Sequence, residues 1–185
     1  MLTADITQPT FPTIHPPTND PRQRVDRKNA EGIIVAVQSV FHKVAKLQER
    51  LAPFYEEFGF RCPSAGVAAR DVSERIELAI IQHCRDFSKG HGHADLARQG
   101  EDWEVKVCQH SGLTINQSKV IARENYIVVN YESKDSRVER IWILWHADDH
   151  DFSPRRSNSN ARFLSWKRAQ LTGRIQLLYQ ADSQS

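Results

Sequence analysis

The chain has 185 residues, of which 39% are hydrophobic and 26% are charged, and its formal net charge is +2. This length suits one domain with a substantial core and is too short for two domains of ordinary size. Mean hydropathy is −0.57, and no run approaches the roughly 20 apolar residues that a membrane helix needs. The opening MLTADITQPT lacks the basic and apolar regions of a signal peptide. We therefore expect a soluble, cytoplasmic protein with no membrane association.

The cysteines indicate whether disulfide bonds are expected, and the prolines indicate where the folded domain begins. The three cysteines, Cys62, Cys84 and Cys108, are too far apart for a CxxC motif, and their odd number argues against a disulfide framework. Five of the eight prolines lie within residues 1–28, where they disfavour both helix and strand. We predict a flexible arm over residues 1–28 and a single domain over residues 29–185.

The first part of that domain is predicted to be helical. Apolar residues recur at steps of three and four from Ala30 to Leu51, the pattern of an amphipathic helix. A second helix is predicted from near Asp71 or Ser73, either of which can cap it, to about Arg85. After Arg85 the hydrophobic pattern changes from a helical period to a period of two residues, which is typical of strands. HGHADLA (91–97) and DWEVKVC (102–108) are predicted strands, joined by a hairpin turn at residues 98–101 that contains a glycine.

The second part combines strands and helices. A short polar helix is predicted over Thr114–Glu124, and strands follow at Tyr126–Tyr131 and Arg140–Trp145. A last helix at Ala161–Leu171 and a strand at Ile175–Tyr179 complete the domain. This order predicts an α/β fold in which a mixed central sheet is flanked by helices, with an N-terminal helical extension.

The strand DWEVKVC carries an acid and a lysine on one face. Because alternate side chains of a strand point to opposite faces, Glu104 and Lys106 share one face, with Cα atoms about 7 Å apart. Asp95, on the neighbouring antiparallel strand, can converge on the same surface. The alternative interpretation is an exposed salt bridge of little energetic value.

Two converging carboxylates favour a cation between them. A hard ion such as Mg²⁺ takes one or two carboxylates together with water and phosphate oxygens, and it lowers the pKa of a bound water. Lys106 can then orient or deprotonate an attacking water, or neutralise charge in the transition state. These are the groups that phosphodiester hydrolysis requires.

Asp95 and, after eight intervening residues, Glu104-Val105-Lys106 resemble the motif of the PD-(D/E)xK nuclease superfamily, which includes many type II restriction endonucleases. The order of elements over about residues 71–146, the expected catalytic core, is similar to that family's helix, three-stranded meander, helix and strand. By this resemblance Asp95, Glu104 and Lys106 are catalytic. Asp95, Glu104 and the Val105 carbonyl are also metal ligands.

The family often carries a further acid on its first core helix. The resemblance assigns this place in the metal site to Glu77, with Glu74 as the second choice. Ala94 stands where the family has its namesake proline, and this departure weakens the match a little. The arm, the first helix and the basic C-terminal part lie outside the resemblance.

The resemblance implies a restriction-endonuclease-like fold and an Mg²⁺-dependent endonuclease that cuts double-stranded DNA, with the specificity of a type II restriction enzyme for a short sequence. It also implies a homodimer and, as in restriction–modification systems, a cognate DNA methyltransferase as a partner. Two alternatives stay open. One is a less selective nuclease of repair, recombination or a mobile element, and the other is a non-catalytic nucleic-acid-binding protein on a degenerate nuclease fold.

The C-terminal part is basic. Residues 152–180 contain six basic residues and no acidic one, and arginine, asparagine and serine are common contacts to bases and phosphates. The alternative is a solvated loop that caps the last helix. We predict that the residues that contact DNA are Arg155, Arg156, Asn158, Asn160 and Arg162, with Lys119 as a weaker candidate.

Two other polar clusters have competing interpretations. His91 and His93 could bind zinc with His83 or Cys84, but no second pair completes the four ligands of a structural site, so a glycine-hinged turn is favoured. The acidic run at residues 148–151 could bind a cation or form an ordinary acidic loop.

Overall fold

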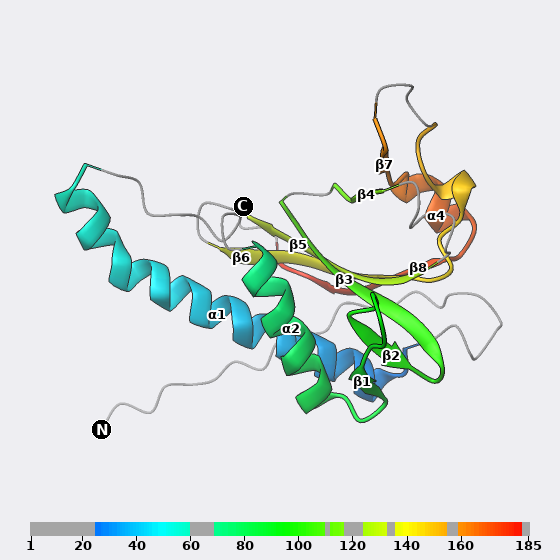
Figure 1. Ribbon diagram of the computed structural model, residues 1–185, viewed down its shortest axis with the longest axis horizontal. Coiled ribbons are helices and arrows are strands. Elements are labelled where there is room, and N and C mark those ends of the chain that lie inside the picture. The colour runs from blue at the N-terminus through cyan, green and yellow to red at the C-terminus, as the bar shows by residue number, and fades with distance from the viewer. Residues whose placement is uncertain are drawn as a thin grey trace.

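The computed structural model of the protein describes residues 25–59, 69–109, 112–116, 124–132, 136–154 and 159–182 (Figure 1). Residues 1–24 of the predicted arm lie outside this part. The last residues of that prediction are wrong, because Val25 is buried in the core and the first helix begins at Arg27. Within it, no helix is both long enough and apolar enough to cross a membrane.

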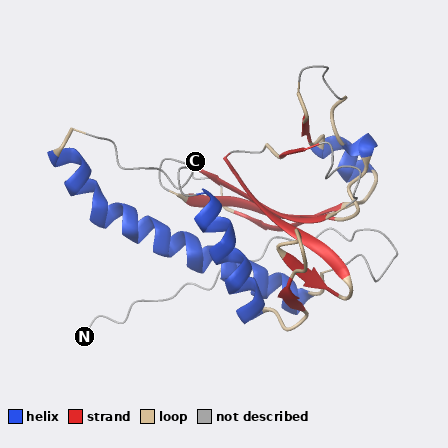
Figure 2. Ribbon diagram, in the orientation of Figure 1, coloured by secondary structure: helices blue, strands red, loops and turns tan. Residues whose placement is uncertain are grey.

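Two helices, α1 (Arg27–Glu57) and α2 (Ala69–His83), cover one face of the central sheet (Figures 1 and 2). Asp26 caps α1, because its carboxylate accepts a hydrogen bond of 2.9 Å from the backbone N–H of Asn29. Both predicted helices are confirmed, but α1 continues past Leu51 through Pro53. Pro53 is exposed, so water can satisfy the carbonyl that its missing N–H leaves unbonded.

The central sheet has six strands in the order β1-β2-β3-β5-β6-β8. β3 and β5 are parallel, and every other neighbouring pair is antiparallel. The strands predicted at residues 126–131, 140–145 and 175–179 are confirmed. The strands of the sheet are β1 (Phe87–Lys89), β2 (Leu96–Arg98), β3 (Glu101–Gln109), β5 (Asn125–Glu132), β6 (Arg137–Leu144) and β8 (Ile175–Gln180).

The hairpin is confirmed at β2–β3, although β2 is shorter than the predicted 91–97 strand. Its turn residues Gln99 and Gly100 have φ values of 53° and 80°, the positive values that two-residue hairpin turns of type I′ require. β1, which pairs with β2, was not predicted. The three strands form an antiparallel meander.

The other face of the sheet is covered by a small second layer. β4 (Thr114–Asn116) pairs with β7 (Ala161–Phe163), and the 3₁₀ helix η2 (Asp149–Asp151) and α4 (Trp166–Leu171) pack nearby. The predicted helix over Thr114–Glu124 is therefore wrong at residues 114–116, and residues 117–123 lie outside the described part. The predicted helix over Ala161–Leu171 is wrong at its start, which is β7. Strand pairing between segments so far apart leaves no local periodic signal.

The strands at the centre of the sheet are buried on both faces. Ile127, Val129 and Ile141 pack beneath α1 and α2, whereas Tyr126 and Val128 pack beneath the second layer. The architecture is thus a mixed, mostly antiparallel sheet flanked by helices, and even the face that carries Glu104 is largely covered.

Candidate active site

The side chains of β3 alternate between the two faces of the sheet, as predicted from the sequence. Trp103 and Val105 join the core under the helices, and Glu104 and Lys106 point to the other face. The Lys106 Nζ forms an ion pair with the Glu104 Oε2, and the two side chains are 30% and 3% exposed. Burying a carboxylate to this degree is costly unless it has a positive partner. The pair is therefore not the exposed salt bridge of the alternative interpretation.

Asp95 lies directly before β2, at the end of the β2–β3 ladder. Leu96 pairs with Trp103 in this ladder, so the next position places Asp95 beside Glu104. The Asp95 Oδ2 accepts a hydrogen bond of 2.8 Å from the backbone N–H of Val105. This bond fixes the Asp95 carboxylate against the middle of the Glu104-Val105-Lys106 triplet.

Gly90 shapes the loop that delivers Asp95, a role that the sequence analysis missed. The Gly90 N–H donates to the Asp95 carbonyl at 3.2 Å, and a Cβ at Gly90 would collide with the Ala94 carbonyl. Only glycine fits this close approach. The two glycines at residues 90 and 92, just upstream of the acid, were the available signal.

Glu77 approaches the same carboxylates from α2. Its pKa is raised to about 7, first by burial and then by the negative charges of Asp95, Glu74 and Glu104, while Lys106 acts in the opposite direction. Glu74 is exposed, whereas Glu77 is partly buried. Of the two acids predicted for the metal site, Glu77 is the one whose pKa is shifted by the charges of Asp95 and Glu104.

The oxygen atoms at this place are chemically suited to Mg²⁺, although they do not form a closed cage. Within the described part of the chain, no three His, Cys, Asp or Glu side chains form a ready metal-binding group. Carboxylate and carbonyl oxygens from Asp95, Glu104 and Val105 are the hard ligands that Mg²⁺ prefers, and Mg²⁺ ordinarily keeps several waters. After burial, the negative charges of Asp95, Glu74 and Glu104 also raise the pKa of Glu77, and a bound cation would act in the opposite direction.

The predicted DNA contacts fall into three groups. Arg155, Arg156, Asn158 and Lys119 lie outside the described residues. Asn160 is exposed just before β7.

Arg162 is buried, and this corrects its predicted role. It donates to the Ser153 carbonyl and pairs with the Asp149 carboxylate at 2.8 Å. Its guanidinium holds η2 against β7, so we remove Arg162 from the proposed set of DNA contacts.

The acidic run at residues 148–151 has arginine partners. Arg174 pairs with Asp148 and, at 2.9 Å, with Asp151, and Arg162 pairs with Asp149. Asp148 also caps η2. The charges of this run are therefore compensated within the fold, and the cation-binding interpretation has no support. His91 and His93 are exposed and belong to no metal-binding group among the described residues.

A cavity of about 320 Å³ opens on the same sheet face as Lys106. Val128 is paired with Lys106 on one side and with Trp142 on the other, so the cavity lies two strands from the lysine. Trp142 stacks on Trp166 of α4 with ring centroids 5.1 Å apart. Nothing local in the sequence signals this contact between β6 and α4. The cavity is lined by Arg140, Trp142, Trp166, Gln170 and Gln180.

Comparison with protein-family models and with curated proteins gave no match for this chain.

Proposed function

We propose that the protein is an Mg²⁺-dependent endonuclease with a restriction-endonuclease-like fold, which hydrolyses phosphodiester bonds in double-stranded DNA. One observation carries the proposal: the Val105 N–H holds the Asp95 carboxylate beside the buried Glu104–Lys106 pair. The spacing of these residues in the sequence and the hydrogen bond from the Val105 N–H to the Asp95 side chain both support the same site.

The order of elements supports the same class. α2, the meander β1–β2–β3 and the parallel strand β5 follow one another in the order of the PD-(D/E)xK core. The helix that this core has between the meander and the next strand would fall at residues 117–123, outside the described part.

Each residue has a role in this proposal. Asp95, Glu104 and the Val105 carbonyl would hold Mg²⁺, with Glu77 contributing from α2. The bound ion would neutralise charge on the phosphate and lower the pKa of a water. The Lys106 ammonium, held at the site by Glu104, would orient the attacking water or neutralise the charge that develops on the phosphate.

We further propose the specificity of a type II restriction enzyme, a homodimer that cuts both strands, and a cognate DNA methyltransferase as partner. The basic segment with Arg155, Arg156, Asn158 and Asn160 supplies the residue types that contact phosphates and base edges. A less selective nuclease would use the same catalytic site. The sequences at the ends of the cleaved DNA must therefore distinguish a restriction enzyme from a less selective nuclease.

The test is incubation of plasmid and genomic DNA with the protein in Mg²⁺, in Mn²⁺ and in EDTA, followed by sequencing of the ends. We expect cleavage with either metal and none in EDTA, with ends that share one short motif. Scattered ends would favour the less selective nuclease. DNA binding that persists in EDTA, with no cleavage in either metal, would favour the non-catalytic binding protein and contradict the proposal.

A further inference from the structure

The C-terminal part of α1 extends beyond the sheet (Figure 1). All of the buried residues of α1 lie between Asn29 and Phe41. Val44 is partly buried and is the last apolar residue of α1 that packs against the core, and Gln48 accepts a hydrogen bond from the Ser136 hydroxyl. The helix nevertheless continues to Glu57. An isolated helical segment of this length has little stability of its own in water, so its apolar side chains need a partner.

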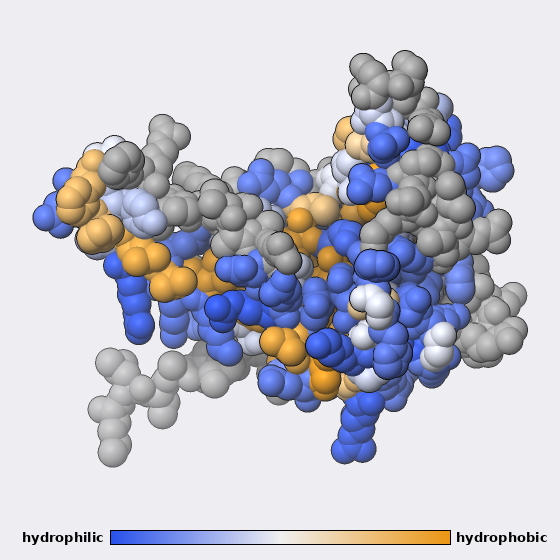
Figure 3. All heavy atoms as spheres, viewed as in Figure 1, coloured by the Kyte–Doolittle hydropathy of each residue, from blue (hydrophilic) through white to orange (hydrophobic). Residues whose placement is uncertain are grey.

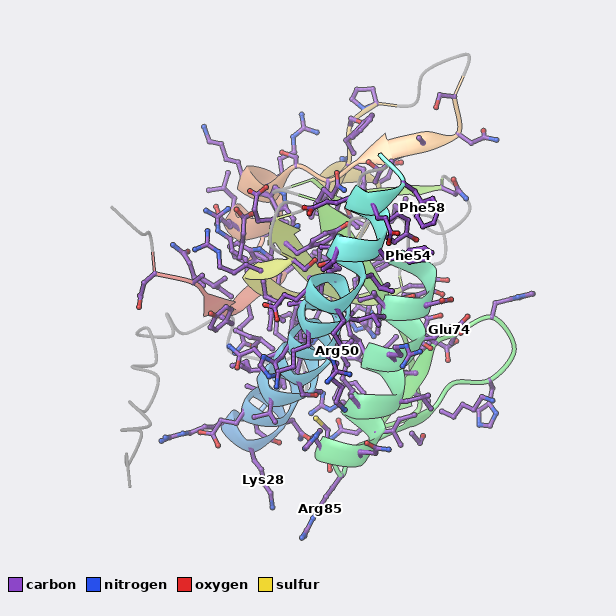
Figure 4. The ribbon with its side chains drawn as sticks, turned by 90° about the vertical axis from the view of Figure 1, so that its left-hand side faces the viewer. Lys28, Arg50, Phe54, Phe58, Glu74 and Arg85 are labelled. Carbon is purple, nitrogen blue, oxygen red and sulfur yellow. The ribbon has the colours of Figure 1, made fainter. Side chains whose placement is uncertain are left out.

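The projecting part carries an exposed apolar stripe, which we define as Leu47, Leu51, Phe54 and Phe58. Their exposed fractions are 55%, 37%, 57% and 58%. The steps of four, three and four residues place them on one side of the helix, the spacing of a coiled-coil seam. Figure 3 shows apolar residues gathered along this projecting end, and Figure 4 shows Phe54 and Phe58 on the same side of α1.

The charges beside the stripe indicate what covers it. Arg50 and Glu57 lie seven residues apart on the same flank of the stripe, and both are exposed. Neither forms an ion pair within the described part of the chain. Charged groups can pair across a two-fold contact only if the surface carries both signs of charge, and this flank does.

We propose that residues 47–58, which are the end of α1 and its C-cap residue Phe58, pair antiparallel with the same segment of a second copy of the chain. This register places Leu47 opposite Phe58 and Leu51 opposite Phe54, and the two-fold axis repeats both contacts. The same register places Arg50 of each copy beside Glu57 of the other. Pro53 lies off the stripe and does not obstruct the contact.

This pairing gives the proposed homodimer a specific interface, but it does not depend on nuclease activity. Its test measures mass, so loss of cleavage and loss of pairing are separate outcomes. A short two-helix contact is at the small end of stable interfaces, so the association is expected to depend on protein concentration.

The experiment is sedimentation velocity of the full chain over a concentration series. The wild type is expected to shift from 21.3 kDa to twice that mass as concentration rises. Arg50→Glu alone and Glu57→Arg alone each place like charges at both symmetric contacts, and each is expected to raise the dissociation constant at least about tenfold. Lys28→Glu, the same charge change near the other end of α1, is the matched control and should dimerise like the wild type.

Two rescues make the test specific for this register. The double variant Arg50→Glu/Glu57→Arg is expected to dimerise again, and an equimolar mixture of the two single variants is expected to form a heterodimer. A parallel pairing would not bring Arg50 and Glu57 together and would show neither rescue. A wild type that stays monomeric, single variants that dimerise normally, or failure of both rescues would overturn the proposal.

Discussion

At the scale of single residues, the site depends on a carboxylate that the fold keeps out of water. Glu104 is 3% exposed at its side chain and is paired with Lys106, and removing one partner of such a pair leaves an uncompensated buried charge. The pair can therefore serve both the fold and the proposed chemistry. Variants that change charge but keep shape separate these two roles.

Asp95 permits such a separation. In Asp95→Asn the amide oxygen can still accept the Val105 N–H, so we expect the free energy of unfolding to change by less than about 1 kcal/mol. The lost charge should lower Mg²⁺ affinity at least about tenfold, measured by calorimetric titration beside thermal unfolding. Asp102→Asn, at an exposed position of β3, is the control and should bind Mg²⁺ like the wild type. Unchanged affinity in Asp95→Asn would exclude Asp95 as a ligand.

The arginines of the basic segment should separate into two kinds. Arg155→Ala and Arg156→Ala are each expected to weaken DNA binding and to reduce the slope of log affinity against log salt by about 0.9, with unchanged stability. Arg162→Ala should instead lower the free energy of unfolding by about 2 kcal/mol, because it removes the bonds to Asp149 and Ser153. DNA titrations at several salt concentrations and urea unfolding measure both effects. Equal behaviour of the three variants would contradict the assignment.

At the scale of elements, the β2–β3 turn holds the register that brings Asp95 to β3. Gly100 has φ of 80° and open space where a Cβ would be. Gly100→Ala should therefore cost about 1 kcal/mol of stability through backbone strain alone. Gly112→Ala, where the space is equally open and no positive φ is found, is the matched control in urea unfolding. Equal loss in both variants would show that the turn is not strained as described.

The cap of α1 gives a pH dependence with a definite sign. The pKa of Asp26 is lowered from 3.8, chiefly by the hydrogen bond from the Asn29 backbone N–H. A carboxyl whose pKa is lowered in the folded state stabilises the fold above its unfolded pKa, and this stabilisation is lost as the pH falls through the folded pKa. Asp26→Ala should cost about 1 kcal/mol at neutral pH, and the difference from the wild type should shrink below about pH 3.8.

Urea unfolding across this pH range is the measurement. Asp26→Asn retains an uncharged cap, so its stability relative to Asp26→Ala should not depend on pH in this way. A constant difference between wild type and Asp26→Ala at all pH values would contradict the role of the charged cap.

The sequence predicted those elements whose signal is local. β5 and β6 contain the apolar runs at residues 126–129 and 141–144, the hairpin has a glycine at its turn, and the first helix has a clear hydrophobic period. Their placement needed no knowledge of distant contacts. The end of α1 was missed because Pro53 is tolerated at an exposed position, and β4 was missed because its partner β7 lies far along the chain.

For the candidate site, too, the features with a local sequence signal were predictable. Alternation along β3 separated Glu104 and Lys106 from the core, and the hairpin brought Asp95 to them. Burial was not predictable, because the second layer that covers this face is assembled from distant segments. For the same reason the sequence could not show that Arg162 is buried or that Trp142 meets Trp166.

At the scale of the whole molecule, the central sheet is packed between two layers, one on each face. The proposed site lies where β2 ends beside β3. α1 and α2 hold one face, and the second layer shields much of the other. The projecting part of α1 lies outside both layers, which is consistent with a separate role in pairing. Catalysis and assembly are therefore expected to respond to different substitutions.

The most direct test of the central claim is the rate at which supercoiled plasmid is cut in Mg²⁺ by Lys106 variants. Lys106→Ala is expected to lower the rate by at least about 100-fold. Lys106→Gln, which retains a hydrogen-bond donor for Glu104 and so protects the fold, should lower it similarly. Lys89→Ala, an exposed lysine of β1 in the same meander, should cut like the wild type. Cleavage by folded Lys106→Ala at the wild-type rate, or no cleavage by the wild type in Mg²⁺ or Mn²⁺, would contradict the account.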